Sequence, residues 1–121
     1  MENSLRLKRI GNSLMLDLIG DEINTIEFDI HLTYIKKIKN FDKLFINMAN
    51  LGDISNDMLN KFRKMRAVLK DKHVCFINIS AMQNSILNLF EIDKLFQLYM
   101  SKTDAIEGKR PIINRKFKIV S

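Results

Sequence analysis

Residues 44–59, LFINMANLGDISNDML, read as a buried strand, a polar turn and the start of a helix. The first part has almost no polar side, which is typical of a central strand covered on both faces. The turn that follows is rich in Asn, Asp, Ser and Gly, so it presents backbone and carboxylate groups at the carboxyl end of the strand. Ligands and partners of open α/β folds usually dock at that end. This stretch therefore predicts the fold class and the functional region together.

Two predicted strands and a helix precede this stretch. Gly11-Asn12, between two runs of alternating polarity, is a two-residue hairpin signal. Asn24 followed by Glu27 predicts a variant of the capping box at the start of a helix. The predicted core positions of the second strand are Leu14, Leu16 and Leu18, and those of the helix are Phe28, Leu32, Ile35 and Ile38.

Further strands and helices alternate after the turn. A second helix is predicted to start at Ser55 or Asn56, with Asp57 in its first turn. A strand over 73–79 follows, and then a helix opened by the capping box of Ser80 and Gln83. A short strand over 95–100 and a brief helix that ends at Gly108 complete the domain. The predicted buried face of the second helix is Leu59, Phe62, Met65 and Leu69.

The resulting order of elements, ββαβαβαβα, predicts an α/β fold. Its sheet is expected to be mixed and mostly parallel, with an antiparallel hairpin at the N-terminus and packed helices. Residues 1–108 form a single predicted domain. Residues 109–121 form a basic C-terminal tail in which Pro111 opposes a continued helix. For this tail the sequence leaves open an edge strand, a docked arm and a disordered terminus.

Composition excludes several classes of protein. The 121 residues suffice for one core without disulfides, and the lone Cys75 lies in an apolar run. No apolar run approaches the roughly 20 residues of a membrane span, and no secretory signal is apparent, so a cytoplasmic location is expected. The net charge of +6 comes mainly from residues 61–72 and the tail. A solvated helix face and a solubilising tail account for it, and nucleic-acid binding is the less favoured alternative.

Catalytic and metal signals are weak. Asp53 and Asp57 are four residues apart, but neither a His nor a third carboxylate accompanies them in the sequence. His31 and His73 lack partners at the spacing of metal ligands. No glycine-rich string that cradles phosphate is present. We therefore expect a protein that is not an enzyme and that needs no metal or cofactor.

Two segments resemble the STAS domain, the sulfate transporter and anti-sigma factor antagonist family. FINMANLGDISNDML is similar to the family segment D-L-S-x-V-x-x-I-D-S-S-G-L. ILNLFEIDKLFQLYMSKTDAI is similar to its closing pattern of a leucine-rich helix, G-L-D-x-L-F, a short strand and a last helix. The resemblance runs from about residue 12 to residue 106. Its matches in the second segment are Ile92, Asp93, Leu95, Phe96, Ala105 and Ile106.

The chain departs from this pattern at two places. The D-S-S-G of the family becomes Ser55, Asn56, Asp57 and Met58. Family members regulated by a serine kinase take phosphate on the second Ser, and Asp57 stands at that place. A permanent carboxylate is a partial imitation of phosphoserine, although Asp57 as a helix-start residue and phosphorylation on Ser55 stay open. Glu91 replaces the usual Gly after the third helix, so an altered helix end is expected there.

The resemblance implies a bacterial regulatory module that acts through protein–protein contacts. Its expected partner is an anti-sigma factor or a serine-kinase-like protein, and without the acceptor Ser it would not be switched in the usual way. Lys61 and Lys64 could steer an acidic partner. Core filling is the default for the methionines, although an exposed Met58 could serve an adaptable contact. A module that senses a nucleotide or a lipid is the alternative. The expected regulatory surface consists of Asn50, Asp53, Ser55, Asn56, Asp57, Met58, Lys61 and Lys64.

Overall fold

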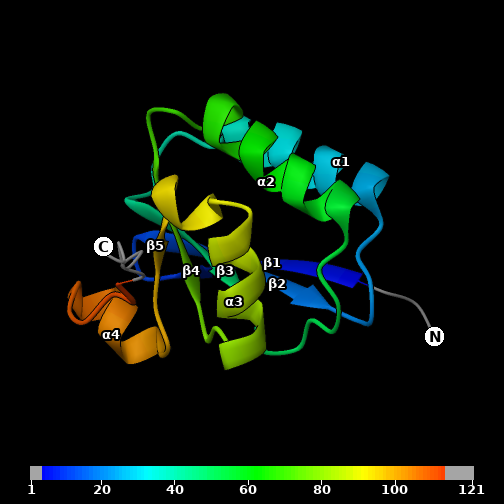
Figure 1. Ribbon diagram of the computed structural model, residues 1–121. Coiled ribbons are helices and arrows are strands. Elements are labelled where there is room, and N and C mark those ends of the chain that lie inside the picture. Colours follow the sequence, from blue (N-terminus) through cyan, green and yellow to red (C-terminus); the bar gives the residue numbers. More distant parts are fainter. Residues whose placement is uncertain (1–3, 114–121) are drawn as a thin grey trace.

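The computed structural model describes residues 4–113 of the chain (Figure 1). Five strands and four α-helices alternate in the predicted order, with one additional turn of 3-10 helix, η1. The strands are β1 (Ser4–Ile10), β2 (Ser13–Ile19), β3 (Lys43–Asn47), β4 (His73–Ile77) and β5 (Gln97–Leu98). The helices are α1 (Thr25–Lys37), α2 (Asn56–Val68), α3 (Ala81–Leu89), η1 (Ile92–Lys94) and α4 (Lys102–Glu107).

The strands form one sheet in the order β1-β2-β3-β4-β5. β1 and β2 pair antiparallel around Gly11-Asn12, and the remaining neighbours pair parallel. β3 lies in the centre, with Leu44 beside Leu14 of β2 and Val74 of β4. The predicted mixed, mostly parallel sheet is therefore confirmed.

Helices α1, α2 and α3 cover one face of this sheet and enclose the main core (Figure 1). Phe28 of α1, Phe62 of α2 and Phe76 of β4 follow one another edge to face, with ring centroids 6.0 and 4.9 Å apart. Phe96 extends this chain, 5.2 Å from Phe76. Edge-to-face contacts of this kind add about 0.5–1.5 kcal/mol each to the free energy gained by burial.

The other face of the sheet is also covered, which the alternating pattern of β2 did not predict. Met15, Phe45, Cys75 and Tyr99 are buried there together with Ala105 of α4. Burial raises the pKa of the Cys75 thiol to about 11. The thiol is therefore protonated at neutral pH and a poor nucleophile, as its apolar surroundings in the sequence indicate.

Several helix ends follow the sequence signals. Ser55 and Ser80 are the N-caps of α2 and α3, and Ser80 forms the full capping box with Gln83. Asn24 caps α1, but the capping box expected with Glu27 is not formed. The Glu27 carboxylate accepts a hydrogen bond from the Leu5 N–H instead, at 3.2 Å, because α1 begins beside β1.

The C-terminal part of the domain differs in two details. The last strand is much shorter than predicted, because Leu95 still caps η1 and the chain pairs with β4 only at Gln97 and Leu98. The expected change at the end of α3 does not occur, since Glu91 adopts the left-handed turn without glycine, at φ 63°. A non-Gly residue pays about 1–2 kcal/mol for this conformation.

The start of the tail docks at the edge of β5. Pro111 forms an antiparallel bridge with Tyr99, and the Ile112 N–H donates to the Leu98 carbonyl at 2.6 Å. An edge position suits Pro111, which has no N–H to donate. The basic residues predicted to mark the rest of the tail lie outside the described residues: Arg115, Lys116 and Lys118.

Candidate functional site

The loop between β3 and α2 is fixed to the end of β2 through its backbone. The Gly20 N–H donates to the Asn50 carbonyl at 3.0 Å, and the Gly52 N–H donates to the Gly20 carbonyl at 2.8 Å. The Asp53 N–H then donates to the Asp21 carbonyl, also at 2.8 Å. A Cβ on Gly52 would lie 3.1 Å from the backbone of Asp21, so this close approach favours glycine. The loop is therefore a continuation of the β2–β3 pairing.

Gln83 holds the same loop from the side of α3. Its buried amide donates to the Met48 carbonyl at 3.0 Å and to the Leu51 carbonyl at 3.2 Å. Its side-chain oxygen accepts from the Ser80 N–H at 2.9 Å. The capping-box spacing located Gln83 in the sequence, but its reach across to the loop has no sequence signal.

Ser55 and Asp57 lie in the first turn of α2. The Ser55 hydroxyl accepts from the Met58 N–H at 3.2 Å and so acts as the helix cap. Asn56 and Asp57 are exposed, and a carboxylate at a helix N-terminus is favoured by about 0.3–1 kcal/mol. The Met58 side chain is fully buried, so core filling holds for it and the alternative of an exposed contact residue is excluded. Met58 precedes Phe62 by four residues, so the helical repeat already placed it on the core side.

The surroundings of Asp57 are acidic. A shallow crevice of about 260 Å³ lies between the N-termini of α1 and α2, which start at the same end of the molecule (Figure 1). Glu22 and Asp57 both line this crevice. The exposed Asp53 adjoins Asp21, to whose carbonyl its backbone is bonded. The surface around Asp57 thus combines carboxylates of the loop and of the neighbouring segment after β2.

Lys61 and Lys64 are both engaged by Asp29 of α1. The Lys61 Nζ lies 2.6 Å from Asp29 Oδ2, and the Lys64 Nζ lies 3.4 Å from Asp29 Oδ1. The hydrogen bond from Lys61, together with the charges of both lysines, lowers the pKa of Asp29. Part of the positive charge expected to steer an acidic partner is therefore compensated within the molecule.

Other basic side chains of α2 and its exit serve the fold. Arg66 donates to the carbonyls of Leu69 and Lys72, at 2.7 and 2.8 Å, and covers the ring of Phe96. The Lys72 ammonium lies 4.7 Å from the centre of the Phe41 ring. These contacts favour the structural interpretation of this basic cluster over a nucleic-acid surface.

A polar ladder crosses the sheet next to the loop, and the sequence analysis did not identify it. Asp17 is buried, accepts from the Asn47 amide at 2.9 Å and lies 3.4 Å from the Lys8 ammonium. The Asn47 oxygen accepts from the Asn78 amide at 2.8 Å and from the Ala49 N–H at 3.1 Å. The ladder joins β1, β2 and β3 to the turn after β4, and it fixes the backbone where the loop begins.

The space available for a small ligand at this end of the sheet is limited. A hollow of about 140 Å³ lies between the loop and the start of α3, lined among others by Asp53, Asn78 and Ser80. Typical ligand pockets measure about 300–1,000 Å³. Met82 borders this hollow with 72% of its surface exposed, so it, and not Met58, is the adaptable apolar side chain beside the loop.

Residues 4–113 include no group of three or more His, Cys, Asp or Glu side chains that could hold a metal ion. His31 and His73 instead contact the Glu27 carbonyl and the Gln97 side chain. Among the described helices, none has the length and apolar character required to cross a bilayer.

Comparisons with known proteins agree with this architecture. No family model and no curated protein matches the chain. An anti-sigma factor antagonist from Mycobacterium paratuberculosis is similar in structure, with a TM-score of 0.77 at 14% identity over 88% of this chain and 93% of that one. An anti-sigma-factor antagonist (STAS) domain protein from Planctomyces limnophilus gives a TM-score of 0.72 at 10% identity, over 86% and 96%.

The anti-sigma factor antagonist SpoIIAA in its unphosphorylated form is similar at a TM-score of 0.58 and 16% identity, over 92% of this chain and all (100%) of that one. SpoIIAA has also been solved in a phosphorylated form, with 13% identity to this chain. The similarity spans nearly the whole length of each neighbour. The fold of this chain is that of a STAS domain.

Proposed function

We propose that the protein is a non-enzymatic bacterial regulatory module that binds an anti-sigma factor, or a related serine-kinase-like protein, in the cytoplasm. The fold and the position of the loop support this proposal. The observation that carries it is the rigid segment from Asn50 to Asp57, which is exposed at the carboxyl end of the central strand. Hydrogen bonds hold this segment from two sides. A preformed loop loses little conformational entropy on binding.

The same loop is proposed to act without phosphorylation. Asp57 occupies the place of the acceptor serine and has no hydroxyl to modify. Its carboxylate gives a constant single charge, whereas phosphoserine carries about −1.5 to −2. The Ser55 hydroxyl is engaged as the helix cap, which makes it a poor substitute acceptor. Partner binding is therefore set by the presence of the two proteins and not by a kinase cycle.

The test is incubation with a panel of purified anti-sigma factor kinases and ATP, followed by intact mass measurement and site mapping. We expect the wild-type chain to gain no phosphate and Asp57→Ser to gain one. Ser55→Ala, made in both backgrounds, controls for modification at the cap. Phosphate on Ser55 of the wild-type chain would contradict the proposal.

Binding to the same panel is measured by biolayer interferometry. Asp57→Lys should weaken the complex by about tenfold or more, which corresponds to roughly 1.4 kcal/mol. Asp71→Lys is the matched control, because it makes the same charge change at an exposed site beyond the other end of α2. Equal losses for both variants would show that the loop is not the contact. Absence of binding to every member of the panel would refute the proposed partner class.

A further inference from the structure

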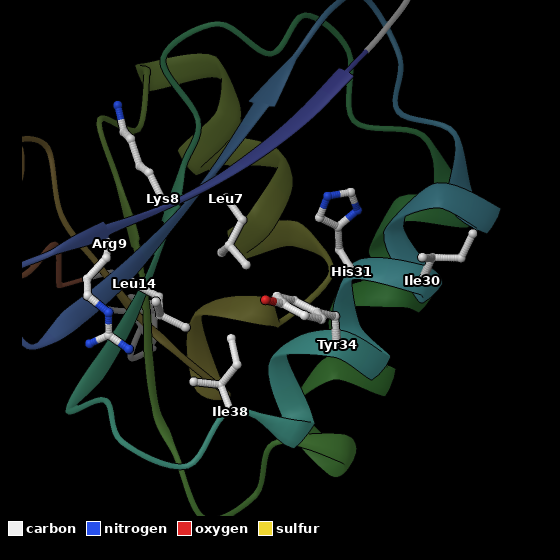
Figure 2. A pocket seen from close by; sticks show the side chains of 8 residues that line it. All are labelled: Leu7, Lys8, Arg9, Leu14, Ile30, His31, Tyr34 and Ile38. Atoms are coloured by element: carbon white, nitrogen blue, oxygen red, sulfur yellow. The ribbon is translucent and has the colours of Figure 1, made fainter.

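An apolar groove of about 660 Å³ lies between the edge strand β1 and helix α1. Figure 2 shows Leu7 and Leu14 of the sheet on one side and Tyr34 and Ile38 of the α1 region on the other, with His31 at one end. The groove is separate from the loop after β3. Nothing in the proposed function requires it.

One wall of the groove includes part of an exposed apolar stripe on α1. Ile26, Ile30 and Tyr34 follow one another at intervals of four residues, and their surfaces are 71%, 62% and 59% exposed. Ile30 and Tyr34 line the groove, whereas Ile26 does not. Apolar side chains that gather beside a groove mark a surface where another molecule is bound.

The other wall offers an unpaired strand edge. The Leu5 N–H donates to the Glu27 carboxylate and so points away from β2. Alternate residues of an antiparallel strand share this direction, so the N–H and C=O groups of Leu7 and Arg9 also face the open edge. Such a row of backbone groups pairs with any extended chain that reaches it. The Glu27 contact closes the edge at Leu5, and no other segment within residues 4–113 pairs with the outward backbone groups of β1.

The edge strand is strongly basic. Arg6 forms no ion pair within residues 4–113, and the Arg9 guanidinium donates to the neutral carbonyl of Asn40 at 3.2 Å. The charge of Lys8 is compensated by Asp17. Successive side chains of a strand alternate between the two faces of the sheet, so Leu7 and Arg9 point to the groove side and Arg6 and Lys8 to the other. Lys8 still borders the groove, although its side chain points away from that of Leu7 (Figure 2).

We propose that this groove binds an extended segment of a partner protein in which apolar and acidic residues alternate. The segment adds a strand beside β1 and bonds the backbone of Leu7 and Arg9. Its apolar side chains enter the groove between Leu7, Tyr34 and Ile38. Its acidic side chains lie on the opposite face, where Arg6 forms no ion pair within residues 4–113. This is recognition by strand addition, in which the backbone supplies affinity and alternate side chains supply specificity.

Charge decides against a second copy of this chain as the occupant. Antiparallel pairing of two β1 strands around Leu7 would place Arg6 of one directly opposite Lys8 of the other. Like charges in directly opposed positions of a sheet are destabilising. An anionic lipid would match the charge but has no backbone to pair with the open edge, so a peptide fits more of the observed features.

The experiment selects a displayed library of random dodecapeptides on the full-length protein. We expect the enriched peptides to alternate apolar with acidic residues. Binding of a synthetic enriched peptide is then measured by fluorescence anisotropy. Ile30→Asp should weaken binding by about tenfold or more, and Ile26→Asp, the same change one turn away and outside the groove, by less than about twofold. Both side chains are exposed, so neither variant should unfold the protein.

Two further measurements identify the mode and the occupant. Two sets of peptides are N-methylated, one at the odd-numbered and one at the even-numbered amides. Only one set should lose binding, because only the amides that face β1 are bonded. The proposal would be overturned if the enriched peptides lacked acidic residues, or if both N-methylated sets lost binding equally. It would also be overturned if Ile26→Asp and Ile30→Asp weakened binding equally. Two other results would contradict it. One is that the protein dimerises and Ile30→Asp abolishes the dimer, and the other is that it binds phosphatidylserine vesicles and Ile30→Asp abolishes that binding.

Discussion

The loop after β3 and the groove beside β1 are both exposed, yet they use their backbone groups in opposite ways. Loop carbonyls and N–H groups are bonded to the Gly20–Asp21 segment and to Gln83. In the groove, the part of the chain that the structure describes leaves the outward backbone groups of β1 open except at Leu5. A surface that is already bonded keeps its shape and presents side chains, whereas an open edge offers the backbone itself. The molecule thus has one preformed surface and one surface that a partner would complete.

Of the variants that test this contrast, we expect the largest loss of stability at Gln83. Gln83→Ala should lower the free energy of unfolding by about 3 kcal/mol, because two buried loop carbonyls lose their donor. Met82→Ala is the matched control on the same helix turn, and its exposed side chain should contribute less than about 0.5 kcal/mol. Urea unfolding measures both. A small effect of Gln83→Ala would mean that the loop is not held by this amide.

A smaller effect is expected where the loop meets β2. Gly52→Ala places a methyl group 3.1 Å from backbone atoms of Asp21, so the backbone itself must shift to make room. We expect a loss of about 2 kcal/mol, in the range of overpacked sites. Hydrogen exchange should also become faster at the Gly52 and Asp53 N–H groups. Unchanged exchange there would show that the loop tolerates separation from β2.

The ion pairs that join α1 to α2 should contribute less. Asp29 has a lowered pKa in the folded state, so its stabilising contribution is complete above its ordinary value of 3.8 and is lost as the pH falls through the folded value. Because the side chain is 33% exposed, Asp29→Asn should cost no more than about 1 kcal/mol at neutral pH. The difference between wild type and variant should shrink in acid, as followed by urea unfolding over a pH series. A difference independent of pH would contradict the assigned role.

The smallest effect on stability is expected in the groove. Ile30→Asp replaces a mostly exposed side chain, so the free energy of unfolding should change by less than about 0.5 kcal/mol. Thermal unfolding followed by circular dichroism checks this result. A loss comparable to that of Gly52→Ala would show that the groove is part of the core and not a surface left open for a partner.

Local signals predicted most of the fold. The Ser-x-x-Gln box at Ser80, the Gly11-Asn12 turn and the cap at Ser55 depend on neighbours in the sequence, and all three formed as expected. Contacts between distant segments were not predictable. Asp17 sits at a position that alternation assigns to solvent, but Asn47 and Lys8 meet it across the sheet and α4 covers the face nearby.

The sequence predicted where most residues of the candidate site lie in the fold, but it did not predict all of their contacts, and their role in binding stays a prediction. Asn50, Asp53, Asn56 and Asp57 are exposed on the loop and the first turn of α2, as the surface requires. Met58 faces the core, a result that the repeat shared with Phe62 could have predicted. The pairing of Lys61 and Lys64 with Asp29 could not be predicted, because it depends on how α1 and α2 pack side by side.

The docking of Pro111 against Tyr99 has a consequence for assembly. It covers the sheet at β5, on the side opposite β1, with a residue that offers no N–H. Growth of sheets into fibres requires two open edges, one to donate and one to receive. Among the described residues only the β1 side remains receptive. This chain should therefore accept one added strand, at β1, so that each molecule binds a single partner segment.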